Sequence, residues 1–247
     1  MSLAVKLALT PVLVAQALRT RGRMPRLPEA AGDRHGRVGR GPLLRLLIAG
    51  DSSAAGVGVV QQRDALAGHL TRALARQCAA TVEWRLVARS GLNTEQTHRL
   101  LESESFHQAD LAVVVTGVND VVEQVASHRA VAARDALANW LRNARGVHHV
   151  VFAPLPPVHR FPGLPQPLRW VAGSDARRHN AALQRWAATR ADVSVAEMDL
   201  PLDASAMASD GFHPGAPAYQ ACGDAIALHI ARRVRPSLRP HPSRESP

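Results

Sequence analysis

Cysteine and aromatic residues are scarce in this sequence, and each shortage excludes a class of protein. Two cysteines in 247 residues are too few for a disulfide-stapled scaffold or for a zinc site built from several cysteines. Aromatic residues make up 4% of the chain, which leaves few side chains on which nucleic-acid bases could stack. With 46% apolar residues the chain can form one sizeable core, and we expect one globular domain.

The excess positive charge is confined to the ends of the chain, which has a formal net charge of +10. Residues 1–40 contain eight cationic and two anionic side chains, and residues 231–247 contain five cationic and one anionic side chain. Residues 41–230 carry equal numbers of cations and anions, so composition gives no support to a basic binding face on the folded body. We therefore expect no nucleic-acid partner.

Residues 1–40 are interpreted as an apolar and basic segment followed by a linker. The apolar run at 3–18 is shorter than the roughly 20 residues that span a bilayer, and four arginines follow it within 19–26. Cations in this position favour a cytoplasmic protein whose N-terminal segment makes peripheral contact with anionic membranes. Two alternatives are a helix that packs on the domain and a cleaved signal peptide at 1–17, which would make the protein secreted or periplasmic.

From residue 43 onward, short apolar runs alternate with helical patterns. The run at 111–116 is almost wholly apolar and β-branched, as expected of a central strand that helices cover on both faces. The alternation predicts a parallel sheet in a three-layer α/β domain over residues 41–234, followed by a disordered tail over 235–247. The expected strands are 43–49, 82–88, 111–116, 149–153 and 193–198. The expected helices are 63–79, 93–105, 129–145, 174–189 and 217–233, and a proline-rich loop at 154–167 is expected to border the site.

Three polar clusters follow predicted strands, where chemistry collects in sheets of this kind. Ser52 follows the first strand on a tight turn, in the sequence Gly-Asp-Ser-Ser-Ala-Ala-Gly at 50–56. Asn119 follows the central strand, and Asp210 and His213 precede the last helix. Each cluster alone is ordinary turn chemistry. Together they supply a nucleophile, an amide donor, a base and a group that orients the base.

These residues resemble the motif blocks of the SGNH/GDSL hydrolase family, and the resemblance spans about residues 43–233. The blocks are Gly-Asp-Ser-Ser at 50–53, Ser-Gly at 90–91, Gly-Val-Asn-Asp at 117–120 and Asp-Gly-Phe-His-Pro at 210–214. The resemblance implies a flavodoxin-like sheet of about five parallel strands and a serine ester hydrolase that needs no cofactor. It assigns Ser52 as nucleophile, Gly91 and Asn119 as oxyanion donors, His213 as base and Asp210 as the third member of the triad.

On this hypothesis His213 takes the proton of Ser52 as the hydroxyl attacks a carboxylic ester or thioester, and an acyl-enzyme forms. The oxyanion would lie against the backbone N–H groups of Ser52 and Gly91 and the side-chain amide of Asn119. Acetylated sugars, lipid acyl esters and thioesters all fit this chemistry. One alternative is an acyltransferase that uses the same triad, and another is a non-catalytic, membrane-associated binding protein on the same scaffold.

Several residues near the predicted site are interpreted as structural or pocket-lining rather than catalytic. Asp51 and Asp120 adjoin the site, and we expect them to hold loop backbone rather than perform acid–base chemistry. No metal site is expected, and Cys78 fits a core position at helical spacing. Trp170 and Phe212 are candidates for lining an acyl pocket.

Overall fold

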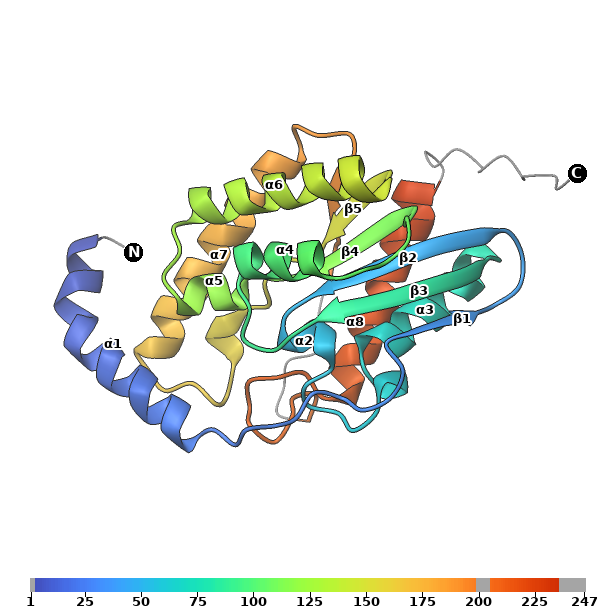
Figure 1. Ribbon diagram of the computed structural model, residues 1–247. Helices are drawn as coiled ribbons and strands as arrows, with labels where there is room; N and C mark the ends of the chain where they lie inside the picture. Colours follow the sequence, from blue (N-terminus) through green and yellow to red (C-terminus); the bar gives the residue numbers. More distant parts are fainter. Residues whose placement is uncertain (1–2, 199–204, 236–247) are drawn as a thin grey trace, which may run out of the picture.

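A six-stranded sheet lies at the centre of the computed structural model, which describes residues 3–198 and 205–235 (Figure 1). The strands are β1 (His35–Val38), β2 (Leu43–Gly50), β3 (Thr81–Ala88), β4 (Leu111–Val115), β5 (His149–Phe152) and β6 (Val193–Val195), in the sheet order β1-β3-β2-β4-β5-β6. Neighbouring strands pair in parallel except β1, which is antiparallel to β3. The five parallel strands have the flavodoxin-like order, with the switch point between β2 and β4, as predicted.

Alternating side chains of the strands build two cores, one on each face of the sheet. Leu46 and Ile48 of β2 share a core with α3 (Leu66–Cys78) and α8 (Ala216–His229). Leu47 and Ala49 belong to the opposite core, together with side chains of α4 (Thr94–Ser103), α6 (Ser127–Arg145) and α7 (Leu168–Ala187). Burial on both faces explains why residues 46–49 are all apolar. The predicted three-layer α/β/α architecture is confirmed.

Local sequence signals account for several helix positions. Four side chains at helical spacing on α3 are buried in the core, and they are Leu66, Leu70, Leu74 and Cys78. A capping box opens α4, since Asn93 and Gln96 each bond the other's backbone N–H. α7 begins earlier than predicted, directly after Pro167, and α8 continues into a π-helical turn (Ile230–Val234). The shorter elements are α2 (Ser52–Ala55), α5 (Val118–Val122) and two 3₁₀ turns at Gln62–Asp64 and Val158–Arg160.

Two strands and the tail differ from the expected pattern. β1 comes from the segment interpreted as a linker, and its sequence His-Gly-Arg-Val has no apolar alternation that would have predicted a strand. β6 ends at Val195 instead of continuing to 198, because its partner β5 ends at Phe152. From residue 236 onward, the tail expected to be disordered lies outside the described residues.

Helix α1 (Leu3–Arg23) runs along the side of the domain, and its N-terminal end points away from it (Figure 1). Its Gln16 side chain donates to the carbonyl O of Gln166 over 2.6 Å and accepts the N–H of Leu168 over 3.1 Å. Apolar side chains of α1 stay exposed, Leu7 at 63% and Leu18 at 68%. Within 3–198 and 205–235, no helix combines the length and apolarity that crossing a bilayer requires.

Candidate active site

Ser52 lies at the carboxyl end of β2, where the strand turns directly into α2. The carbonyl O of Val115, at the end of β4, accepts the Asp51 N–H over 3.1 Å. A Cβ on Gly50 would lie 2.2 Å from that same oxygen, so this approach of the two strand ends requires glycine. The Asp51 carboxylate caps α2 by accepting the Ser53 N–H over 3.0 Å. The turn therefore places Ser52 at the switch point of the sheet.

His213 connects Ser52 to Asp210 through its two ring nitrogens. Its Nε2 lies 3.0 Å from Ser52 Oγ, and its Nδ1 lies 2.6 Å from Asp210 Oδ2. The other carboxylate oxygen of Asp210 accepts the backbone N–H groups of Phe212 and His213, each over 2.9 Å. Burial acts to raise the pKa of Asp210, but these hydrogen bonds outweigh it and lower the pKa below its ordinary value. Asp210 thus stays ionised and holds both the turn and the imidazole.

The two remaining site residues, Gly91 and Asn119, lie beside Ser52. Gly91 follows β3 with φ +83°, a left-handed backbone conformation that favours glycine. The Asn119 amide, on α5 after β4, donates to the Leu92 carbonyl O over 2.9 Å and makes a long 3.5 Å contact with Asp51 Oδ2. Ser52, Gly91, Asn119 and His213 all line one cavity of about 590 Å³. The structure thus brings the five predicted site residues together.

Sequence comparison assigns the chain to a family. A model described as the GDSL-like lipase/acylhydrolase family matches residues 48–221. The chain belongs to this family. The protein is therefore a carboxylic ester hydrolase of the SGNH/GDSL type, as the motif resemblance implied. A comparison with curated proteins found no match.

Solved structures of GDSL-type enzymes share the fold. A lipase, Lip_vut3 from a goat rumen metagenome, aligns with a TM-score of 0.60 at 19% identity, over 77% of this chain and 98% of that one. The lipase/acylhydrolase from Enterococcus faecalis aligns with a TM-score of 0.57 at 19% identity, over 80% and 98% of the two chains. The esterase EstA from Pseudoalteromonas sp. aligns with a TM-score of 0.56 at 16% identity, over 75% and 96%. At these identities the likeness concerns the fold.

The N-terminal segment, outside the residues matched by the GDSL family model, holds the turn that carries Gly91. One carboxylate oxygen of Glu29 accepts both the N–H and the hydroxyl of Ser90, over 2.7 and 2.8 Å. The other oxygen accepts from Arg34, which also donates to the carbonyl O of Ala88 over 2.7 Å. Burial raises the pKa of Glu29, but these bonds lower it overall. Sequence reasoning missed Glu29, because a single glutamate in a proline-containing stretch carries no recognisable pattern.

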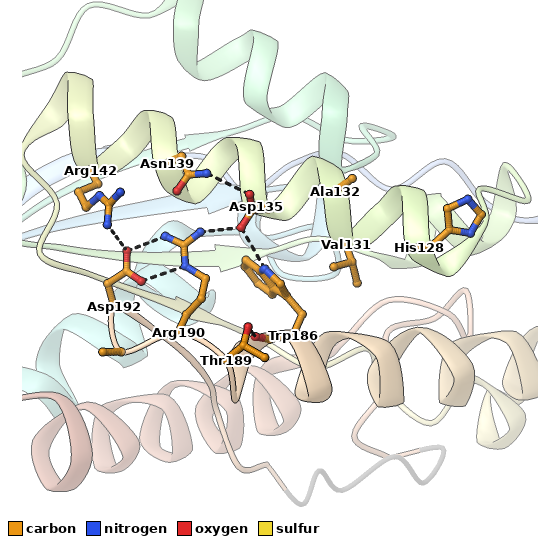
Figure 2. Close-up of a pocket in the computed structure, with 11 residues that line it drawn as sticks. His128, Val131, Ala132, Asp135, Asn139, Arg142, Trp186, Thr189, Arg190 and Asp192 are labelled. Atoms are coloured by element: carbon orange, nitrogen blue, oxygen red, sulfur yellow. Dashed lines mark hydrogen bonds and ion pairs between the residues drawn. The ribbon is translucent and has the colours of Figure 1, made fainter.

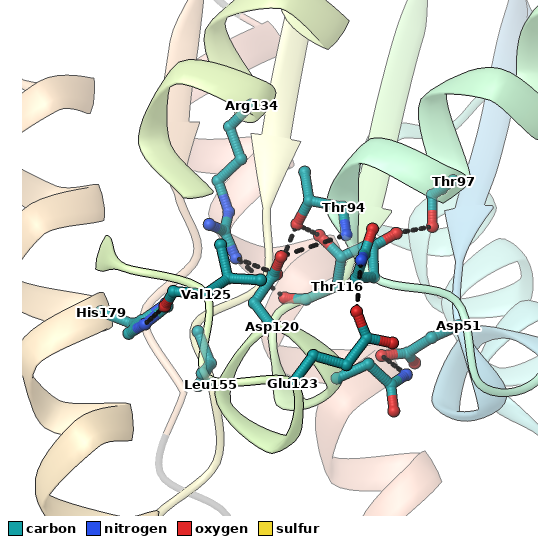
Figure 3. Close-up of polar contacts among 12 residues, drawn as sticks. Asp51, Thr94, Thr97, Thr116, Asp120, Glu123, Val125, Arg134, Leu155 and His179 are labelled. Carbon is teal, nitrogen blue, oxygen red and sulfur yellow. Dashed lines mark hydrogen bonds and ion pairs between the residues drawn. The ribbon is translucent and has the colours of Figure 1, made fainter. Parts of the chain in front are cut away.

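A buried polar cluster surrounds Asp120, the residue that follows Asn119 in the sequence (Figure 3). The Asp120 carboxylate accepts the Thr94 hydroxyl over 2.6 Å and the Thr94 N–H over 3.3 Å, and Arg134 lies 3.5 Å away. The Asp120 and Arg134 side chains are almost fully buried, at 2% and 1% exposure. The cluster ties the start of α4, close to Gly91, to the helix that carries Asn119. Asp120 therefore holds backbone, in line with its interpretation from the sequence.

Asp51 is the second carboxyl group close to the triad, and it also holds backbone through its cap on α2. Burial raises its pKa from 3.8 to about 7. The Ser53 N–H and the nearby His213 oppose this shift, and Asp120 adds to it. Asp51 is thus a buried carboxyl group whose ionisation is unfavourable at the centre of the site.

A second, more open hollow of about 900 Å³ lies between α6 and the turn that follows α7 (Figure 2). Its polar side chains bond one another: Asp135 accepts from Trp186 and Arg190, and Arg190 pairs with Asp192 over 2.7 Å. This network joins α6 to the residues that directly precede β6, so we assign it a structural role. Among the described residues, no group of three or more histidine, cysteine or carboxylate side chains could hold a metal ion.

Proposed function

We propose that the protein hydrolyses carboxylic esters or thioesters through an acyl-enzyme intermediate on Ser52. The supporting observation is the chain of contacts from Ser52 Oγ through His213 to Asp210, with separations of 3.0 and 2.6 Å. These distances are within the range required of a nucleophile, its base and the group that orients the base. The family supplies the reaction class, and this geometry supports the proposed roles of the three residues.

Each step moves one proton through His213. Its Nε2 accepts the Ser52 proton as Oγ bonds to the carbonyl carbon, and it returns that proton to the alcohol or thiol as the bond to the leaving group breaks. Water then attacks the acyl carbon and gives a proton to His213, and Ser52 regains a proton as the carboxylic acid leaves. Asp210, with its lowered pKa, stabilises the imidazolium at both stages without taking up the proton.

The negative charge that develops on the carbonyl oxygen meets three donors. These are the backbone N–H of Ser52, the backbone N–H of Gly91 and the side-chain amide of Asn119. The Ser52 N–H belongs to the first turn of α2, where N–H groups have no acceptor within the helix. The Asn119 amide donates to the Leu92 carbonyl O over 2.9 Å and to Asp51 Oδ2 over a long 3.5 Å, and the oxyanion would replace the weaker contact with Asp51.

The assignment is tested by covalent labelling and by substitution at two adjacent serines. A serine-reactive phosphonate should label Ser52, as located by peptide mass spectrometry, and Ser52→Ala should abolish hydrolysis of p-nitrophenyl esters. Ser53→Ala is the matched control, because it removes an adjacent hydroxyl that the mechanism does not use, and it should retain activity. Labelling of Ser53, or full activity in Ser52→Ala, would overturn the proposal.

We also propose that α1 makes peripheral contact with anionic membranes on the cytoplasmic side. The exposure of Leu7 and Leu18 supports this, as does the cluster of arginines at the C-terminal end of the helix. The double variant Leu7→Ser/Leu18→Ser should lose cosedimentation with phosphatidylglycerol vesicles and keep its hydrolysis of a soluble ester. Val60→Ser, which changes an apolar residue 78% exposed elsewhere on the domain, is the control and should bind like the unmodified protein. Equal binding by the double variant would contradict the proposal.

A further inference from the structure

The cavity that contains Ser52 and His213 has an apolar inner end. Side chains from the sheet, α3 and α8 line it there, and several of them are fully or almost fully buried. The lining side chains include the buried Leu66, Ala218 and Ile226 and the partly buried Val115 and Cys222. Phe212 also lines the cavity, whereas Trp170 does not and is 44% exposed on α7. An apolar interior of this kind suits the hydrocarbon part of an acyl group.

The outer end of the same cavity is cationic. Its wall there comes from the end of α1 and the segment that follows, residues 24–27, which runs along the lower edge of the domain in Figure 1. Arg21 and Arg26 are exposed, and among the described residues that line the cavity no other lysine, arginine, aspartate or glutamate is present. Neither arginine has a carboxylate partner within the described ranges. Among the described residues no acidic side chain lines this mouth, so the charge of its described wall is positive.

We propose that Arg21 and Arg26 bind a phosphate group of the substrate, so that the natural substrate is an acyl ester or thioester that carries a phosphate. The inference rests on the proposed hydrolase function, because it takes Ser52 as the point where the acyl group is attacked. Guanidinium groups match phosphate oxygens in geometry and charge, and two of them can contact one phosphate together. With the acyl chain in the apolar end, the phosphate would remain at the mouth on the side of the leaving group.

The family motifs do not reveal this phosphate subsite, because both arginines lie outside them. Arg21 and Arg26 precede residue 48, where the match to the family model begins. They approach the cavity because Gln16 of α1 and residues 29–31 bond to the domain. There the Ala30 carbonyl O accepts from Gln62, and the Ala31 N–H donates to the Val60 carbonyl O over 2.9 Å. The arginines thus come from a segment that is fixed beside the catalytic turn.

The test compares two double variants of the full chain that remove equal charge. Arg21→Ala/Arg26→Ala removes the proposed subsite, and Arg19→Ala/Arg23→Ala removes two arginines of the same region that do not line the cavity. Hexyl phosphate should inhibit hydrolysis of neutral p-nitrophenyl hexanoate competitively. Its inhibition constant should rise about tenfold in the first variant and less than about twofold in the second. KM and kcat for the neutral ester should stay unchanged in the control variant Arg19→Ala/Arg23→Ala.

Two substrates, tested separately, distinguish a soluble phosphate-bearing thioester from a phospholipid as the natural substrate. Hexanoyl-coenzyme A represents soluble thioesters, and a lysophosphatidylglycerol represents lipids. The substrate whose kcat/KM falls about tenfold in Arg21→Ala/Arg26→Ala alone identifies the source. Equal losses in both double variants would mean general electrostatic attraction and would overturn the subsite, as would no loss in either. If the unmodified protein fails to hydrolyse any ester, the hydrolase proposal fails separately, and calorimetric titration of hexyl phosphate still decides whether the arginines bind phosphate.

Discussion

Replacing Asp51 by asparagine should make the stability of the protein less sensitive to pH, because Asp51 ionises unfavourably in the folded state. Its pKa is raised from 3.8 to about 7, mainly by burial. Between these two pH values the unfolded chain has released the proton while the folded protein still holds it. Folding then takes up a proton, so Asp51 lowers the free energy of unfolding progressively as the pH rises through this window.

The size of the effect follows from the same two pKa values. At 1.36 kcal/mol per pKa unit, the raised pKa of Asp51 lowers the free energy of unfolding by about 4 kcal/mol above pH 7. At pH 5 the same pKa difference lowers it by less than half of that amount. Relative to the unmodified protein, Asp51→Asn should therefore gain roughly 2–3 kcal/mol between pH 5 and pH 8. Comparing two pH values cancels the constant effect of the changed hydrogen bonds.

Urea unfolding followed by circular dichroism at pH 5 and pH 8 measures this difference. Asp64→Asn, at an exposed carboxyl group, controls for the removal of one negative charge. If the stability difference between Asp51→Asn and the unmodified protein is the same at both pH values, then Asp51 titrates alike in the folded and unfolded states. The reasoning from burial would then be refuted.

Four further outcomes are expected. Asn119→Ala should lower kcat by roughly 10²–10³ with little change in KM, the usual effect of losing one oxyanion donor, and a loss under about threefold would mean that the amide points elsewhere. Glu29→Ala should lower kcat about tenfold while Glu29→Gln, which can still accept the Ser90 N–H, restores most of it; equal losses would contradict a positioning role. Arg134→Met should reduce the free energy of unfolding by about 3–5 kcal/mol in urea titrations, since it leaves Asp120 buried and unpaired, and an unchanged midpoint would argue against the pair. Cys222, whose pKa burial raises to about 12, should resist iodoacetamide at pH 7.5 in the folded protein and react after unfolding in urea, as mass spectrometry can show.

The parallel strands and the catalytic cluster could be predicted because their signals are local. Residues 46–49 are apolar without a break, and the polar residues that follow them stand where a switch point must lie. The sheet then brings Ser52 to His213, although 161 positions separate them in the chain. Motif resemblance supplied Gly91, which periodicity alone does not distinguish from an ordinary turn glycine.

Contacts between residues far apart in the sequence could not be predicted where no recognisable sequence pattern links the two residues. Arg134 lies on a helix rich in charged residues, where an arginine indicates a solvent-facing side, yet its side chain is 1% exposed because Asp120 lies opposite it. Glu29 reaches Ser90 across 61 positions, and nothing near either residue signals the pairing. The N-terminal segment consequently resembled a linker, although it supplies a strand and a contact to the catalytic turn.

The antiparallel strand β1 also protects the sheet from self-association. Without it, the outer side of β3 would present a row of free N–H and C=O groups beside Val82, Trp84 and Leu86, and such an open edge readily pairs with another chain. β1 closes this edge with a short strand that contains His35 and Arg37, and Arg37 pairs with Glu83. A protein that began at Leu43, with β2 as its first strand, would keep Ser52, Asp210 and His213 but lose this cover, together with the contact of Glu29 to Ser90. The open edge of β3 would then favour aggregation.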